Sequence, residues 1–262
     1  MEFSQLPLRE QKYARTKVGL LTHAVDMLSS TSLDDLSIKE LCRRAEVSEA
    51  TFYNYFPHKC ELLKYFVQLW TLEMMWLSKN KWETTGIEHI NNVFEYTSAT
   101  SVQDSYMMGE IIVLLARIGM TPPTGEVTLA ERLLIFPDCP GVDDLPTNGF
   151  DSVILPAVEE AFRQGDIPAN AGVETVVMGL IALFFGMPIS LYKQKLAPAA
   201  YVDMMMTQLD IFWRGLGATR GVSATRLFVF DESERAIPQF GQADTVYPMF
   251  LSDFLDCRTT NR

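Results

Sequence analysis

The chain has 262 residues, of which 48% are apolar, and a formal net charge of −11 at pH 7. This length allows one large or two modest domains, and the apolar content supports a well-buried core. No run of ~18 or more consecutive apolar residues is present, so we expect no membrane-spanning segment and no membrane partner.

The negative charge is unevenly distributed along the chain. Residues 1–60 contain eight Lys and Arg and eight Asp and Glu, so the net charge of −11 falls entirely on residues 61–262. Exposed charges more than ~8 Å apart are largely screened at physiological salt. Repulsion of the neutral N-terminal part from a polyanion such as DNA should therefore be modest, and its few basic residues imply a shallow salt dependence of any such binding.

The cysteines and histidines give no sign of a metal or cofactor site. Cys42, Cys60, Cys139 and Cys257 form no C-x-x-C pair and have no histidine at metal-ligand spacing. The N-terminal stretch MEFSQLPLREQK lacks the apolar core of a signal peptide. We therefore expect a cytoplasmic protein in a reducing compartment, with no cofactor and no metal.

The first predicted helix covers Arg9 to Ser30, after a loose lead of residues 1–8. Its apolar stripe includes Leu21, Val25 and Leu28 at helical spacing. Its early turns carry four basic residues, which approach the DNA backbone or simply form a solvated face: Arg9, Lys12, Arg15 and Lys17.

The stretch from Ser37 to Lys59 predicts two short helices joined by a tight turn. Ser37 is a good N-cap, and Glu40 three residues later completes a capping box for a helix from Ile38 to Ala45. Ser48 is a second N-cap, for a helix from Glu49 to about Phe56.

The outward face of the second helix is unusual for a plain solvated surface. It carries two tyrosines, a threonine and an asparagine, which suit phosphate oxygens and base edges. Lys59, at the start of the next helix, is a natural phosphate anchor. The alternative is an ordinary helical hairpin whose tyrosines pack on a neighbour. The outward residues are Glu49, Ala50, Thr51, Tyr53, Asn54 and Tyr55.

This stretch resembles the DNA-binding domain of the TetR family of bacterial transcriptional regulators. The matching residues are the helix Ile38 to Ala45, Val47-Ser48, Thr51-Phe52-Tyr53, Tyr55-Phe56, Lys59 and Glu61-Leu62-Leu63. The resemblance places DNA contacts at Ser37, Lys39, Ser48, Glu49, Ala50, Thr51, Tyr53, Asn54, Tyr55 and Lys59. Two positions depart from the family pattern: Glu46, where glycine is frequent, and Tyr55, where histidine is common.

The remaining pattern is helical. A long helix from Cys60 to Trp82 follows, which in the family joins the DNA-binding and regulatory domains. Further helices are expected over Glu88 to Thr100, Asp104 to Ile118, Thr128 to Phe136, Phe150 to Gln164, Asn170 to Lys195 and Ala199 to Gly215. We thus predict an all-α fold, with an N-terminal helix-turn-helix three-helix domain and a helical-bundle regulatory and dimerisation domain.

The segment AFRQGDIPANAGVETVVMGLIALFFGMPI also resembles the family, in which two antiparallel helices here form the dimer interface. Its apolar residues cover more than one helix face, so both core burial and contact with a second subunit are expected. Pro188 is expected to kink this helix or end it early. We therefore predict a homodimer.

The tail from residue 221 to 262 is too apolar for a free linker. Arg226 to Asp231 is expected to form a short strand, and Tyr247 to Asp256 a short amphipathic helix. We expect the tail to dock on its own or the partner's regulatory domain.

Aromatic and methionine side chains in the middle of the chain are candidates to line an effector cavity. For each one, core packing is the competing interpretation. The candidates are Trp70, Met74, Phe94, Tyr106, Met107 and Glu110. No catalytic motif is present, so we expect no enzyme.

Together these patterns predict a ligand-responsive transcriptional regulator, most simply a repressor that a small-molecule effector releases from double-stranded operator DNA. The expected domains are residues 1–58 for DNA binding, 59–220 for ligand binding and dimerisation, and 221–262 as a C-terminal extension. The alternative is a helical ligand-binding or scaffold protein of the same fold without DNA-binding activity.

Overall fold

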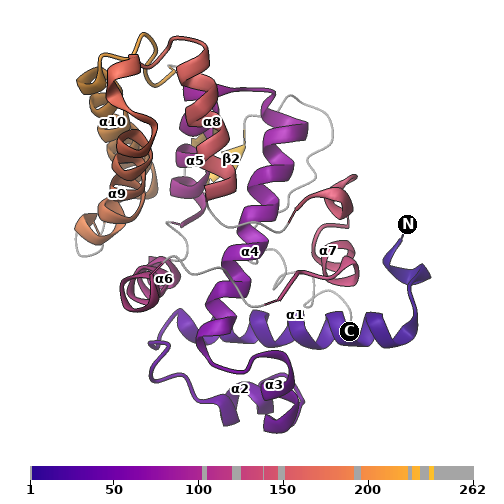
Figure 1. The fold of residues 1–262 in the computed structure, drawn as a ribbon. Coiled ribbons are helices and arrows are strands. Elements are labelled where there is room, and N and C mark those ends of the chain that lie inside the picture. The colour runs from indigo at the N-terminus through magenta and orange to yellow at the C-terminus, as the bar shows by residue number, and fades with distance from the viewer. Residues whose placement is uncertain are drawn as a thin grey trace. The chain divides into compact units, whose positions relative to one another are not determined.

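A computed structural model of the chain describes residues 2–101, 105–119, 125–137, 139–146, 151–191, 196–223, 226–230 and 236–238. Within these residues the fold is all-α, as predicted, apart from one short antiparallel hairpin (Figure 1). The helix expected over Tyr247 to Asp256 lies outside the described residues.

The N-terminal elements follow the predicted pattern closely. A 3-10 turn η1 (Phe3–Gln5) precedes α1 (Leu8–Leu28), and α2 (Ile38–Arg44) and α3 (Glu49–Tyr55) form the expected pair of short helices. The long helix expected next is α4 (Cys60–Leu77), and its last turn continues as the π-helical turn η2 (Ser78–Trp82).

The later helices also lie where the sequence predicts them. They are α5 (Gly86–Ser101), α6 (Ser105–Ile118), α7 (Leu129–Ile135), α8 (Asp151–Arg163), α9 (Val173–Leu191) and α10 (Pro198–Leu216), with the 3-10 turns η3 (Val142–Asp144) and η4 (Ala169–Ala171). Thr128 caps α7 in a full capping box with Glu131. The expected strand within Arg226 to Asp231 is β1 (Phe228–Phe230), which pairs with β2 (Ala236–Pro238).

The chain divides into two compact units, each with its own packing. Unit 1 combines Met1–Trp76 with Glu110–Gly149, and unit 2 combines Leu77–Gly109 with Phe150–Thr245, as far as these residues are described. The units are defined by packing, whereas the expected domains 1–58, 59–220 and 221–262 were defined by function. Those functional boundaries stay a prediction.

In unit 1, the segment around α7 is organised by the buried guanidinium of Arg132. It donates to the carbonyl oxygens of Val127 (3.0 Å) and Val142 (3.1 Å), and also to those of Asp143 and Leu145. Two side chains of α4 also bond to the backbone of this segment. Gln68 donates to the Gly125 carbonyl (2.7 Å), and Trp76 donates to the Pro140 carbonyl (2.9 Å). The segment 125–146 is thereby fixed to α4.

In unit 2, α5 packs between α8 and α10, and buried polar side chains tie α5 to the chain beyond α10. Trp213 Nε1 donates to Asn91 Oδ1 (2.9 Å), while Asn91 Nδ2 donates to the Gly221 carbonyl (3.0 Å). Further along, the Leu227 amide donates to Glu95 Oε1 (2.8 Å). The described part of the tail is thus docked on α5.

Among the described helices, α9 is long and apolar enough, by length and composition, to cross a bilayer. Its buried residues are Val176, Leu180, Phe184 and Leu191. It continues past Pro188 to Leu191. Gly179 lets α10 approach closely, since a Cβ there would lie 2.5 Å from the ring of Phe212. On other sides α9 exposes large apolar side chains, among them Met178 (63% exposed) and Ile189 (59%).

Candidate DNA-binding surface

Two serine caps set the start of α2 and α3. Ser37 Oγ accepts a hydrogen bond from the Glu40 amide (3.3 Å), and Ser48 Oγ accepts one from the Thr51 amide (3.1 Å). The second half of the expected capping box at Ser37 is replaced: among the described residues, the Glu40 carboxylate accepts from two arginines. Both caps lie at the exposed surface.

The turn between the two helices places Glu46 at φ 56°, in the left-handed region. A residue with a Cβ pays roughly 1–2 kcal/mol there, which glycine avoids. The departure from glycine noted at this position therefore has a structural cost. The hydrogen bond from the Val47 amide to the Cys42 carbonyl (3.0 Å) nevertheless closes the turn.

The inner face of the pair forms a small aromatic core. Phe52 and Phe56 are buried with ring centroids 5.7 Å apart, and Phe56 in turn contacts the ring of Tyr65 on α4 (5.9 Å). The burial of Phe52 on α3, and of Phe56 directly after it, fixes which face of α3 turns outward.

The outer face of α3 carries the side chains that the sequence predicted to lie there. Glu49, Ala50 and Asn54 are exposed, and Tyr53 is 51% exposed. Thr51 is half-buried, and its hydroxyl lies 2.8 Å from that of Ser48. Tyr55 is also half-buried, since its ring contacts Tyr13 of α1 at 4.6 Å.

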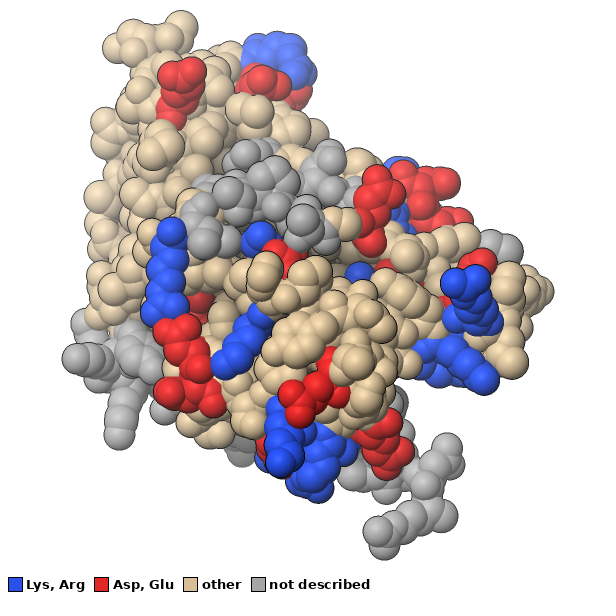
Figure 2. All heavy atoms as spheres, turned by 60° about the horizontal axis from the view of Figure 1, so that its bottom comes forward, with Lys and Arg blue, Asp and Glu red and all other residues tan. Residues whose placement is uncertain are grey.

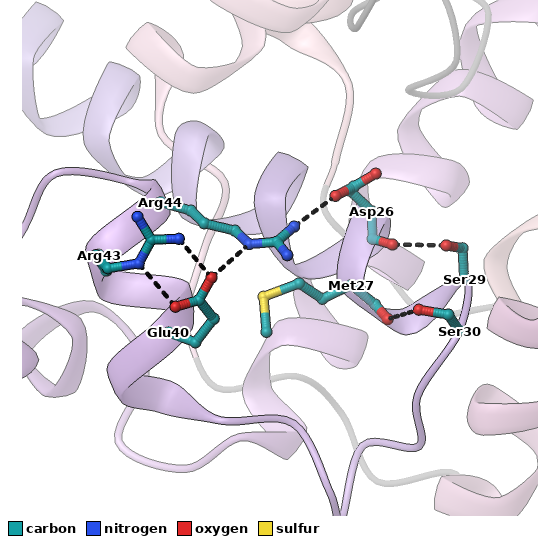
Figure 3. A network of polar contacts seen from close by, with 7 residues as sticks. All are labelled: Asp26, Met27, Ser29, Ser30, Glu40, Arg43 and Arg44. Atoms are coloured by element: carbon teal, nitrogen blue, oxygen red, sulfur yellow. Dashed lines mark hydrogen bonds and ion pairs between the residues drawn. The ribbon is translucent and has the colours of Figure 1, made fainter.

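The arginines at the end of α2 are neutralised locally (Figure 3). Arg43 donates two bonds to Glu40 (2.8 and 2.7 Å), while Arg44 bridges Glu40 (3.0 Å) and Asp26 (2.8 Å). The hydrogen bonds from Arg43 and then Arg44 lower the pKa of the Glu40 carboxyl to about 2. This network attaches α2 to α1 and leaves little free positive charge.

The face of the protein that carries α2 and α3 has no separate basic patch within the part described. Figure 2 shows Lys and Arg interspersed with Asp and Glu among mostly uncharged side chains. Lys39 is exposed on α2 and extends the candidate surface beyond α3. This face therefore presents hydrogen-bonding groups and shape more than bulk positive charge.

Lys59, expected to anchor a phosphate, lies half-buried at the start of α4. Its Nζ donates to the carbonyl of Asp34 (2.9 Å) and approaches that of Leu33 (3.4 Å). Helix α6 contacts the same two residues: Glu110 Oε2 accepts from the Leu33 amide (2.9 Å), and Arg117 donates two bonds to the Asp34 carboxylate. The arginine lowers the pKa of Asp34 through these bonds.

This arrangement, which we call the 33–34 clamp (Leu33, Asp34, Lys59, Glu110 and Arg117), was not expected from the sequence. Glu110 was predicted as an effector ligand, and the structure places it on the backbone amide of Leu33, four residues before the Ser37 cap of α2. No local spacing signals contacts across more than 75 positions.

The other candidate effector residues are spread over both units. Met74 is buried and Trp70 half-buried in unit 1, whereas Phe94 and Met107 are buried in unit 2, where Phe94 contacts the ring of Phe184 at 5.3 Å. The side chain of Tyr106 lies outside the described residues. Effector binding by these residues stays a prediction.

Comparison with known proteins decides the family of the helix pair. Residues 20–66 match the family model described as bacterial regulatory proteins, tetR family. These residues belong to the TetR family. The match runs from the second half of α1, through α2 and α3, into the first turns of α4, so it contains every DNA contact that the family resemblance places between Ser37 and Lys59.

Three solved structures match part of the chain, each with a TM-score below 0.5. Salmonella enterica GusR has 19% identity and a TM-score of 0.48, covering 77% of this chain and 94% of its own. A gamma-butyrolactone receptor (ArpA-like protein) has 15% identity and a TM-score of 0.47, covering 78% of this chain and 89% of its own. A TetR transcriptional regulator from Rhodococcus sp. RHA1 has 19% identity and a TM-score of 0.45, covering 77% of this chain and 98% of its own. No curated protein matches the chain. The assignment therefore rests on residues 20–66.

Proposed function

We propose that this protein is a ligand-responsive transcriptional regulator, a repressor that a small-molecule effector releases from operator DNA in the cytoplasm. The observation that carries the proposal is the TetR-family match over a capped helix pair with an exposed polar face on α3. In this reading α3 enters the major groove.

The outward residues of α3 divide by chemistry into two groups. Asn54 is suited to pair with adenine, and Glu49 to accept from cytosine N4, so these two side chains would distinguish sequences. Thr51 and Tyr53, with Ser37, Lys39 and Lys59, are suited to phosphate oxygens, which fix position but carry no sequence information. Because free cations are few on this face, the Tyr53 hydroxyl would contribute much of the binding to phosphate oxygens.

Homodimerisation is proposed from the surface of α9. Its exposed apolar side chains, Met178 and Ile189, favour a face that a second copy covers rather than one left in water. Two copies related by a two-fold axis would place their α3 helices in successive major grooves, ~34–36 Å apart.

The 33–34 clamp supplies a contact through which an effector could act on α2. Glu110 and Arg117 lie on one face of α6, and both hold the segment that leads into α2. An effector that binds more tightly when α6 is displaced would weaken DNA binding by that difference in affinity.

Variants of α3 test the proposal directly on a duplex selected by the wild-type protein from random sequence. We expect Tyr53→Ala to weaken binding about tenfold or more on every sequence. Asn54→Ala should instead lose about 1–3 kcal/mol of discrimination at one base pair. Titrations at one fixed salt concentration measure both effects.

Asn170→Ala is the matched control, because Asn170 is an exposed asparagine of η4 in unit 2. Unchanged binding by Tyr53→Ala would contradict the proposed docking. The second candidate function, a helical ligand-binding or scaffold protein without DNA-binding activity, is favoured by the paired state of Arg43, Arg44 and Lys59. It predicts that even the wild-type protein selects no duplex.

A further inference from the structure

Helix α7 lies outside the TetR-family match and carries a fully buried carboxylate. Glu131 is 0% exposed, and its Oε2 accepts from the Thr128 amide (2.7 Å) and hydroxyl (2.6 Å). These bonds cap α7 and use one carboxylate oxygen. The other oxygen is directed to α1.

The partner of that second oxygen is Lys17. Its Nζ lies 2.7 Å from Glu131 Oε1 and 4.1 Å from the ring centroid of Tyr65 on α4. The Lys17 side chain is only 12% exposed, so both charges are largely withdrawn from water. A buried pair of this kind holds its two elements in one geometry, because separating them strands a charge. Here the Lys17–Glu131 pair joins α1 to α7, and Lys17 lies over the ring of Tyr65 on α4.

Tyr13 extends this contact to the DNA-reading helix. It lies four residues before Lys17, hence on the same face of α1. Its ring meets that of Tyr55 on α3 at 4.6 Å, with an interplanar angle of 52°. Burial raises the pKa of Tyr13, and the charges of Glu131 and Tyr55 add to the rise, as expected for groups that lie near one another.

Apolar packing supports the same arrangement along the rest of α1. Leu6, Ala14 and Ala130 form one buried cluster that joins the start of the chain to α7. Phe3, Leu129, Leu133 and Leu134 pack around it. The contact between α1 and α7 is therefore a continuous interface in unit 1, with the ion pair at its polar end.

We propose that α7 supports the recognition helix from behind, with Glu131 as a positioning residue that acts through Lys17 and Tyr13 to fix Tyr55 and α3. The consequence for DNA affinity rests on the proposed function, whereas the support of α3 does not. The contact that positions α3 would thus be separate from the 33–34 clamp, which contacts the segment before α2.

Hydrogen exchange in the DNA-free protein tests the support itself. Glu131→Gln keeps an acceptor for Thr128 and removes the charge, and Lys17→Met removes the cation. In the double variant no lone charge remains. We expect amide exchange over Phe52 to Phe56 to rise about tenfold or more in all three proteins, with α9 in unit 2 unchanged.

Two results would overturn the proposal. The first is exchange in α3 that returns to the wild-type rate in the double variant, which would trace the effect to a stranded charge alone. The second is an equal rise in α3 and α9, which would mean general destabilisation.

Tyr13 provides an independent pair of variants that leaves the ion pair intact. We expect Tyr13→Ala to raise α3 exchange and to weaken binding of the selected duplex about tenfold, while Tyr13→Phe, which keeps the ring contact, behaves as wild type. Wild-type exchange in Tyr13→Ala would contradict the proposal. A wild-type protein that selects no duplex would instead contradict the proposed function and leave the exchange result to decide this one.

Discussion

Arg132→Met should lower the free energy of unfolding by about 3 kcal/mol or more. The buried guanidinium serves four backbone carbonyls between residues 127 and 145, and each buried acceptor left unpaired costs about 1–3 kcal/mol. Methionine fills similar volume but donates nothing, so the loss is one of hydrogen bonds. Chemical denaturation followed by circular dichroism measures the change.

Arg163→Met is the matched control for this substitution. Arg163 ends α8 with an exposed side chain that pairs only with Glu160 among the described residues, so its loss should change stability by less than about 1 kcal/mol. If the two variants were equally stable, the carbonyl cluster would not be what fixes segment 125–146. In that case interactions other than the Arg132 hydrogen bonds would have to fix the position of α7.

Met178→Glu is expected to convert the proposed dimer to a monomer and to weaken binding of the selected duplex about 100-fold. Met178 is the most exposed large apolar side chain of α9, and a carboxylate placed in an apolar interface would have no partner there. A monomer would retain one recognition helix and lose the second half-site. Sedimentation and duplex titration measure the two effects.

Leu8→Glu adds the same charge at an equally exposed apolar position on α1 and should leave the sedimentation coefficient unchanged. A dimer that persists in Met178→Glu would show that α9 is not the subunit contact. If the protein became monomeric while retaining full affinity, the two-fold reading of DNA would be wrong instead.

Most of the fold could be predicted because its signals are local. Ser37 and Ser48, the two predicted N-caps, each mark a helix start through a bond to an amide three residues away, and both caps are present. The apolar spacing that predicted Ile38 to Ala45 and Glu49 to Phe56 gave helices that end one residue earlier. The short strand within Arg226 to Asp231 was likewise predicted from its composition.

The contacts between distant residues could not be predicted in this way. Lys17 and Glu131 are separated by more than one hundred positions, and a lysine on α1 is equally consistent with a solvated face. Asp34 and Arg117 are similar, since nothing local distinguishes a paired aspartate from a free one. The packing of α6 and α7 in the folded chain decides which charged side chains form ion pairs.

The candidate site falls between these cases. The outward face of α3 follows from helical periodicity, and Tyr53 and Asn54 are exposed as expected. Tyr55 and Lys59 also make contacts within the protein, with Tyr13 and with the loop at Leu33 and Asp34. These partners lie outside residues 37–59, so the pattern of that stretch could not predict them.

Selection of binding sites from a random duplex library by the full-length wild-type protein tests the central claim most directly. A dimer that reads DNA through two copies of α3 should enrich an inverted repeat, with half-site centres one helical turn, about 10–10.5 base pairs, or a multiple of it apart. Failure to enrich any sequence over the starting library, or enrichment of a site without two-fold symmetry, would contradict it.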